Sequence, residues 1–75
     1  MALRPEPTAP FHSVQHALRI LEVVAKHASG VSDIMLARET RLPAHQLADL
    51  LRMLRREGYV EQIADGAYVG GNALT

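Results

Sequence analysis

The stretch LPAHQLADLLRMLRREGYVEQIADGAYVGG, which spans Leu42–Gly71, carries the clearest structural signal in the chain. Its apolar residues recur at helical spacing as far as Glu57, and Gly58 then provides a helix stop. Two short runs follow, on either side of an Asp-Gly turn at Asp65 and Gly66, which is the pattern of a small β-hairpin. The stretch therefore predicts a helix that leads directly into a hairpin.

The predicted helix spans Ala44–Glu57 and buries one face. The buried series is Leu47, Leu50, Leu51 and Leu54, with Met53 at its margin. Pro43 stands just before the first turn, where a helix tolerates proline. The opposite side consists of His45, Gln46, Ala48, Asp49 and Arg52.

Ser13 is the predicted N-cap of an earlier helix, which should end near Ala28. The expected core face of this helix consists of Val14, Ala17, Leu18, Leu21, Val24 and Ala25, which recur at helical spacing. Ile20 and Val23 form a second, smaller stripe. In a small domain that stripe is either additional core or a dimer interface, and both interpretations stay open.

A shorter helix is predicted between these two, over Asp33–Thr40 with Ser32 as its N-cap. We expect Ile34, Ala37 and Met35 to face inward, and Arg38 and Glu39 to face solvent. Val31 is expected to add a short strand to the hairpin. Residues 41–43 then form the turn that leads into the last helix.

Three helices followed by a hairpin are the pattern of a winged helix-turn-helix, a mainly α fold with a two- or three-stranded β wing. In this fold the exposed N-terminal half of the third helix enters the major groove of double-stranded DNA. The sequence therefore favours DNA binding over catalysis. The expected DNA-contacting residues are Arg41, Ala44, His45, Gln46, Ala48, Asp49, Arg52 and Arg55.

Composition and length limit the other possibilities. The chain of 75 residues is expected to form one domain over residues 13–71, preceded by a flexible, proline-rich arm over residues 1–12. It has no Cys, so disulfides and thiolate metal sites are excluded. The opening MALRPEPTAP lacks an apolar signal core, and no apolar run approaches the roughly 20 residues that cross a bilayer. We therefore expect a cytoplasmic protein without a membrane partner.

The formal net charge is zero, whereas phosphate attraction normally supplies much of the affinity for DNA. The charges are unevenly placed along the chain. Between Arg38 and Glu57 lie five Arg and three acidic residues, which leaves an excess of two positive charges there and two negative charges elsewhere. The positive excess thus falls on the two helices that would approach DNA.

Catalytic and metal sites are not expected. The sequence has no Gly-rich phosphate loop, no Cys nucleophile and no pair of carboxylates that would frame a cleft. His12 and His16 have no Asp or Glu at a nearby third ligand position, so a metal site is not predicted either. We expect a protein that is not an enzyme and needs no cofactor.

Two segments, SVQHALRILEVVAKH (residues 13–27) and ARETRLPAHQLADLLRMLRREGYVEQIADGAYVGG (residues 37–71), resemble the DNA-binding domain of the isocitrate-lyase-regulator (IclR) family of bacterial transcription factors. The resemblance rests on the order and spacing of the ALRIL, LP, LL and GYVE motifs. It implies a homodimeric winged helix-turn-helix. Residues 72–75 would then begin a linker to a separate C-terminal domain that binds a small-molecule effector.

The chain departs from the family pattern on the predicted DNA face. Family members commonly have a small polar pair and an Arg where this chain has His45, Gln46 and Asp49, and they often have Arg after the Asp-Gly turn, where Ala67 stands here. Asp49 has two interpretations. Its carboxylate accepts a hydrogen bond from a cytosine amino group, or it pairs with Arg52 on the helix surface. These departures predict weaker or differently targeted DNA binding.

The main alternative belongs to another functional class. The dimerisation module of small-molecule O-methyltransferases is also a winged helix, and its helix and hairpin are similar to LLRMLRREGYVEQ (residues 50–62). That module does not bind DNA, which suits the zero net charge and Asp49. The opening SVQHALRIL (residues 13–21) fits the regulator better. A third possibility is a winged helix that serves only as a protein-interaction scaffold.

Overall fold

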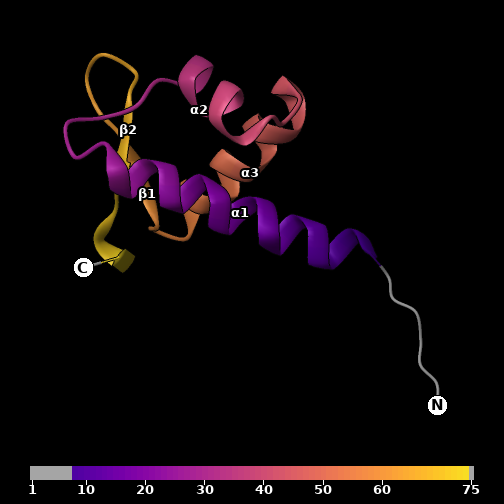
Figure 1. Cartoon of the computed structure of the whole chain (residues 1–75). Coiled ribbons are helices and arrows are strands. Elements are labelled where there is room, and N and C mark those ends of the chain that lie inside the picture. Colours follow the sequence, from indigo (N-terminus) through magenta and orange to yellow (C-terminus); the bar gives the residue numbers. More distant parts are fainter. Residues whose placement is uncertain (1–7, 75) are drawn as a thin grey trace.

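The computed structural model describes residues 8–74 and confirms three helices followed by a two-stranded antiparallel hairpin (Figure 1). The elements are α1 (Thr8–Lys26), α2 (Asp33–Thr40), α3 (Ala44–Arg56), β1 (Val60–Gln62), β2 (Tyr68–Gly70) and the 3₁₀ turn η1 (Asn72–Leu74). Residues 1–7 of the predicted arm and Thr75 of the predicted linker lie outside the described residues. Within residues 8–74, no helix combines the length and apolar content needed to cross a bilayer.

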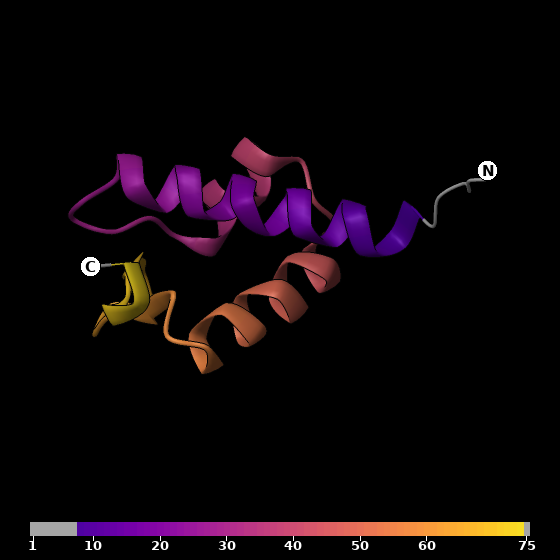
Figure 2. The ribbon, with the colours of Figure 1, turned by 90° about the horizontal axis from the view of Figure 1, so that it is seen from below.

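Helix α1 begins at Thr8, so the prediction that Ser13 caps it is wrong. Residues 8–12, which were assigned to the flexible arm, belong to the helix instead. Pro10 does not prevent this extension, because it lies in the first turn, where backbone N–H groups have no partner within the helix. The earlier start lengthens α1 to 19 residues, and Figure 2 shows its N-terminal end projecting beyond α3.

The predicted core face of α1 is correct only in part, because Val24 is buried and Ala17 and Leu21 are half-buried against the core. Ile20, Val23 and Val24 are the buried residues, with exposed fractions of 0%, 4% and 1%. Val14 and Leu18, which were assigned to the core, are 57% and 56% exposed. Ile20 and Val23 are therefore core residues and are not available as a dimer interface. The cause is tertiary, since α1 packs this side against α2, α3 and β2.

Helix α2 begins and ends where the sequence predicts. The hydroxyl of its N-cap, Ser32, accepts a hydrogen bond from the backbone N–H of Met35 at 3.1 Å. Its buried residue is Leu36, at 0% exposure, whereas Ile34 is 70% exposed and Met35 is also classed as exposed. The prediction that Ile34 and Met35 face inward is therefore wrong, because the short helix docks through Leu36 and half-buried Ala37.

The leucine pattern of α3 is confirmed for three of its four members. Leu47, Leu51 and Leu54 are each 3% exposed, while Leu50 is only half-buried. The helix ends at Arg56, and Gly58 follows with φ of +85°. Glycine adopts this left-handed conformation without the steric cost that a Cβ atom would add, which explains the stop.

The wing pairs Val60 with Gly70, Glu61 with Val69 and Gln62 with Tyr68. Val31 adds the expected third strand as a single antiparallel bridge. Its N–H donates to the Tyr68 carbonyl at 3.0 Å, and the Tyr68 N–H donates to the Val31 carbonyl at 2.8 Å. This bridge fixes the hairpin beside the C-terminal end of α1 (Figure 1).

One apolar cluster connects all of these elements. Its buried members are Ile20, Val23, Val24, Val31, Leu36, Leu42, Leu47, Leu51, Leu54, Val60 and Tyr68. Every helix and both strands contribute to it. The cluster therefore holds α2 and α3 in a fixed relation to the wing, which determines where the surface of α3 points.

Candidate nucleic-acid interface

The turn between α2 and α3 fixes the angle between these two helices. Arg41 adopts a left-handed conformation with φ of +61°, and its N–H donates to the Ala37 carbonyl at 2.8 Å. Leu42, 7% exposed, anchors the turn in the core. The left-handed conformation costs a non-glycine residue about 1 kcal/mol, and the packing of Leu42 offsets that cost. The Arg41 side chain is exposed at the edge of α3.

Most of the sequence-predicted contact residues lie on one exposed surface. The exposed members are Arg41, Ala44, His45, Ala48, Asp49, Arg52 and Arg55. They come from the turn and from the exposed side of α3, where Ala44 and Ala48 lie next to the buried leucines. We refer to these seven residues as the α3 surface.

Gln46 is the exception among the predicted contact residues. It is half-buried, and its Nε2 lies 3.1 Å from Nδ1 of His16 on α1. The amide group is therefore engaged in a link between α1 and α3, and it is not on the open surface beside its neighbours. Sequence spacing could not indicate this pair, because the two residues are 30 positions apart.

Asp49 and Arg52 form an ion pair on the α3 surface. Arg52 Nη1 lies 3.1 Å from Asp49 Oδ1, and the two side chains are 70% and 69% exposed. This is the surface pairing that the sequence allowed. Because both groups are well solvated, the pair adds little to stability. Its main consequence is that the carboxylate offsets part of the positive charge of Arg52.

The wing contributes turn geometry and no positive charge. Asp65 Oδ1 accepts a hydrogen bond from the Ala67 N–H at 3.0 Å, and Gln62 Nε2 donates to the Gly66 carbonyl at 3.0 Å. No Lys or Arg occurs between Tyr59 and Gly71. The charged side chains of the wing are therefore only acidic, at Glu61 and Asp65.

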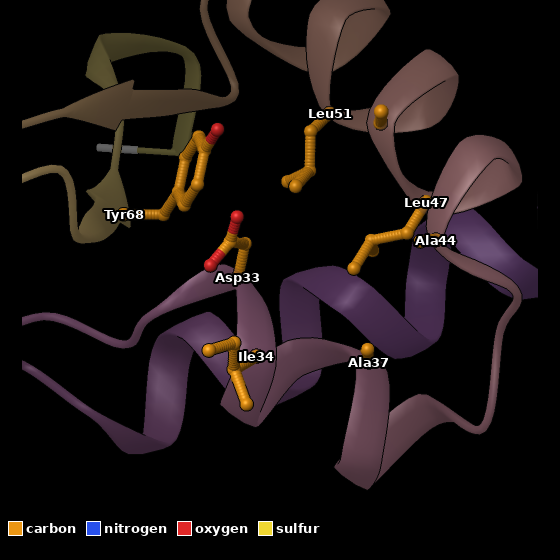
Figure 3. Close-up of a pocket in the computed structure, with 8 residues that line it drawn as sticks. Asp33, Ile34, Ala37, Ala44, Leu47, Leu51 and Tyr68 are labelled. Carbon is orange, nitrogen blue, oxygen red and sulfur yellow. The ribbon is translucent and has the colours of Figure 1, made fainter.

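An apolar recess of about 170 Å³ adjoins the α3 surface (Figure 3). It lies between α2, α3 and the Tyr68 ring of β2. Sequence reasoning missed it because it forms only where Tyr68 of the wing meets α2 and α3, which precede it by many residues. Except for Asp33, all of the residues that line the recess are apolar or aromatic.

Among the described residues, no group of three or more His, Cys, Asp or Glu is placed to hold a metal ion.

The family model of the IclR helix-turn-helix domain matches residues 13–64. This match covers more than half of the chain and includes all three helices from Ser13 onward, together with β1. The chain belongs to the IclR family. It is therefore a DNA-binding domain of a transcription regulator, and the match favours that function over the methyltransferase module.

A solved structure shows the same fold. It is described as a transcriptional regulator of the IclR family from Rhodococcus sp., and it superposes with a TM-score of 0.80 at 24% sequence identity. The similarity covers 99% of this chain and 30% of that chain. This chain thus spans less than a third of the length of the Rhodococcus protein. The comparison with curated proteins gives no match.

Proposed function

We propose that this IclR domain inserts α3 into the major groove of double-stranded DNA and contacts it through the α3 surface. The observation that carries the proposal is the arrangement of that surface. Small or polar residues fill the exposed N-terminal half of α3, and three Arg flank them, at the turn and along the helix. Arginine supplies phosphate contacts, while the residues between them lie where base edges would be.

In this proposal, Asp49 lowers the affinity of the α3 surface for DNA. A carboxylate about 6 Å from a phosphate costs about 0.7 kcal/mol even at the dielectric constant of water. Arg52, held 3.1 Å away, neutralises part of that repulsion in the free protein. On DNA the guanidinium group is shared between Asp49 and a phosphate, so the domain binds more weakly than it would with a neutral residue at position 49.

We also propose that the domain acts as a homodimer through α1, by a surface different from the one that the sequence suggested. Val14, Leu18, Leu21 and Ala25 follow one another along α1 beside its buried side, with Leu21 half-buried against the core, and we call them the outer stripe. Val14 and Leu18 are more than half exposed. An apolar row of this kind on a protruding helix suits association with a second copy, and two copies would match two operator half-sites.

A salt titration of binding to random duplex DNA tests the proposed DNA surface. Asp49→Asn should tighten binding about threefold, the equivalent of about 0.7 kcal/mol, because it removes one repulsive charge. Arg52→Gln should weaken binding and reduce the slope of log K against log salt by about 0.9, the value of one phosphate contact.

The matched control substitutions remove one negative and one positive charge from α1 instead of from α3. Glu22 and Lys26 are exposed residues of α1, which contributes no residue to the α3 surface, so Glu22→Gln and Lys26→Gln should each alter binding much less than their counterparts. If the control substitutions change affinity and salt slope as much as Asp49→Asn and Arg52→Gln do, the DNA surface is not on α3. Any small-molecule effector is proposed to act through a further domain of the full-length regulator.

A further inference from the structure

The recess beside α3 has an unusual lining for a surface that faces nucleic acid. Ala44 and Ala48, one helical turn apart, form the α3 side, and both are exposed. Ile34 of α2, 70% exposed, forms the opposite side. Figure 3 shows Ile34 and Ala44, together with Leu51 and the Tyr68 ring, around the recess. The recess thus presents aliphatic groups to solvent within the proposed interface.

The recess is continuous with the α3 surface, and this limits what can occupy it. Ala48 lies one helical turn from His45 and from Arg52, so a base pair that contacts those polar residues also lies close to the recess. In the major groove, the thymine 5-methyl is the apolar group that a base pair presents. Alanine cannot donate or accept a side-chain hydrogen bond, so polar base edges gain nothing at these positions.

Charge argues against the sugar-phosphate backbone as the occupant. Asp33 lines the recess and is exposed, and its carboxylate would repel a phosphate placed there. A thymine methyl is uncharged and small, and a volume of about 170 Å³ accommodates it easily. The recess therefore suits the methyl edge of a base rather than the backbone.

We propose that the recess formed by Ile34, Ala44 and Ala48 recognises a thymine methyl group and so specifies an A·T pair in the operator. This inference rests on the proposed function, because it requires α3 to lie in the major groove. It assigns specificity to an α2 residue and to two alanines that have no polar group with which to contact a base.

Paired DNA probes that differ only in the methyl group test the inference. Duplexes that bind this chain are first enriched from a random library, and the enriched sequences are then remade with deoxyuridine in place of each thymidine in turn. At one or more positions the loss of the methyl should weaken binding about fourfold, which corresponds to about 0.8 kcal/mol for one buried methyl-sized group.

Two variants connect this effect to the recess. Ile34→Ala removes one wall, and Ala48→Gln fills the space, so each should bring the thymidine-to-deoxyuridine affinity ratio close to one. Both positions are exposed, so the fold should tolerate them. Met35→Ala is the matched control for Ile34→Ala, because Met35 is its neighbour on α2 and does not line the recess. That control should keep the wild-type ratio.

The outcomes separate this inference from the proposed function. If the chain binds specific sequences but replacement of thymidine by deoxyuridine changes the affinity at no position, the inference is overturned and the DNA-binding function stands. A methyl effect that persists in both recess variants places methyl recognition elsewhere and also overturns it. If Ile34→Ala changes self-association in sedimentation but leaves the thymidine-to-deoxyuridine affinity ratio unchanged, the recess belongs to a contact between copies and the inference is overturned. Failure to enrich any sequence overturns the proposed function and the inference together.

Discussion

The choice of core face on α1 can be tested with two substitutions on the same helix. Ile20 is completely buried, whereas Leu18 is 56% exposed. Truncation of a buried Ile to Ala costs about 2–5 kcal/mol. At about 0.05–0.15 kcal/mol per residue, a chain of 75 residues has a total stability of about 4–11 kcal/mol. Ile20→Ala should therefore remove a large part of the free energy of unfolding, and Leu18→Ala should change it by less than about 0.5 kcal/mol.

Urea denaturation followed by far-ultraviolet circular dichroism measures both variants. At low micromolar concentration, Ile20→Ala should lower the unfolding midpoint strongly with little change in the m-value. Leu18→Ala should resemble the wild type there. At high protein concentration the wild type should gain stability by dimerisation, and Leu18→Ala should not, because Leu18 belongs to the outer stripe.

The opposite ranking would refute this packing of α1. If Leu18→Ala costs as much as Ile20→Ala at low concentration, the side of α1 that carries Leu18 faces the core. If Ile20→Ala leaves the midpoint unchanged, Ile20 does not pack against α2 and α3. Stability that is independent of concentration in both proteins would leave the core assignment intact and contradict the proposed dimer.

Two further predictions concern local features of the fold. Ser32→Ala should lower the free energy of unfolding by about 1 kcal/mol, because the Met35 N–H loses its hydrogen-bond acceptor, whereas exposed Ser29→Ala should have little effect in the same urea experiment. Gly71→Ala should lower it by about 1–3 kcal/mol, because an added Cβ would collide with the Gly58 carbonyl, and a thermal melt that matches the wild type would contradict this close packing.

The pattern of residues within α3 predicts only part of the contact surface, because contacts with distant elements determine the rest. The leucine phase of α3 was enough to place His45, Ala48, Asp49 and Arg52 on the exposed side. It was not enough for Gln46, whose amide lies against His16 of α1. The recess was also inaccessible to sequence reasoning, since Ile34, Ala48 and Tyr68 meet only after α2, α3 and the wing have packed.

The elements that depend on local interactions could be predicted from residue types alone. Ser32 caps α2 through a residue three positions away, Gly58 ends α3 by its own conformation, and Asp65 holds the hairpin turn through Ala67. Each interaction spans only a few residues, so the pattern of residue types is sufficient to predict it.

Which side of α1 is buried depends on packing between elements and could not be predicted from the residue pattern. Ile20 and Val23 form one apolar stripe, the larger predicted face that includes Val14 and Leu18 forms another, and both have helical spacing. Periodicity shows that such a helix has an apolar side, but with two candidates it cannot rank them. The ranking comes from burial against Leu36, Leu47 and Tyr68, residues that are distant in sequence and close to α1 only in the folded domain.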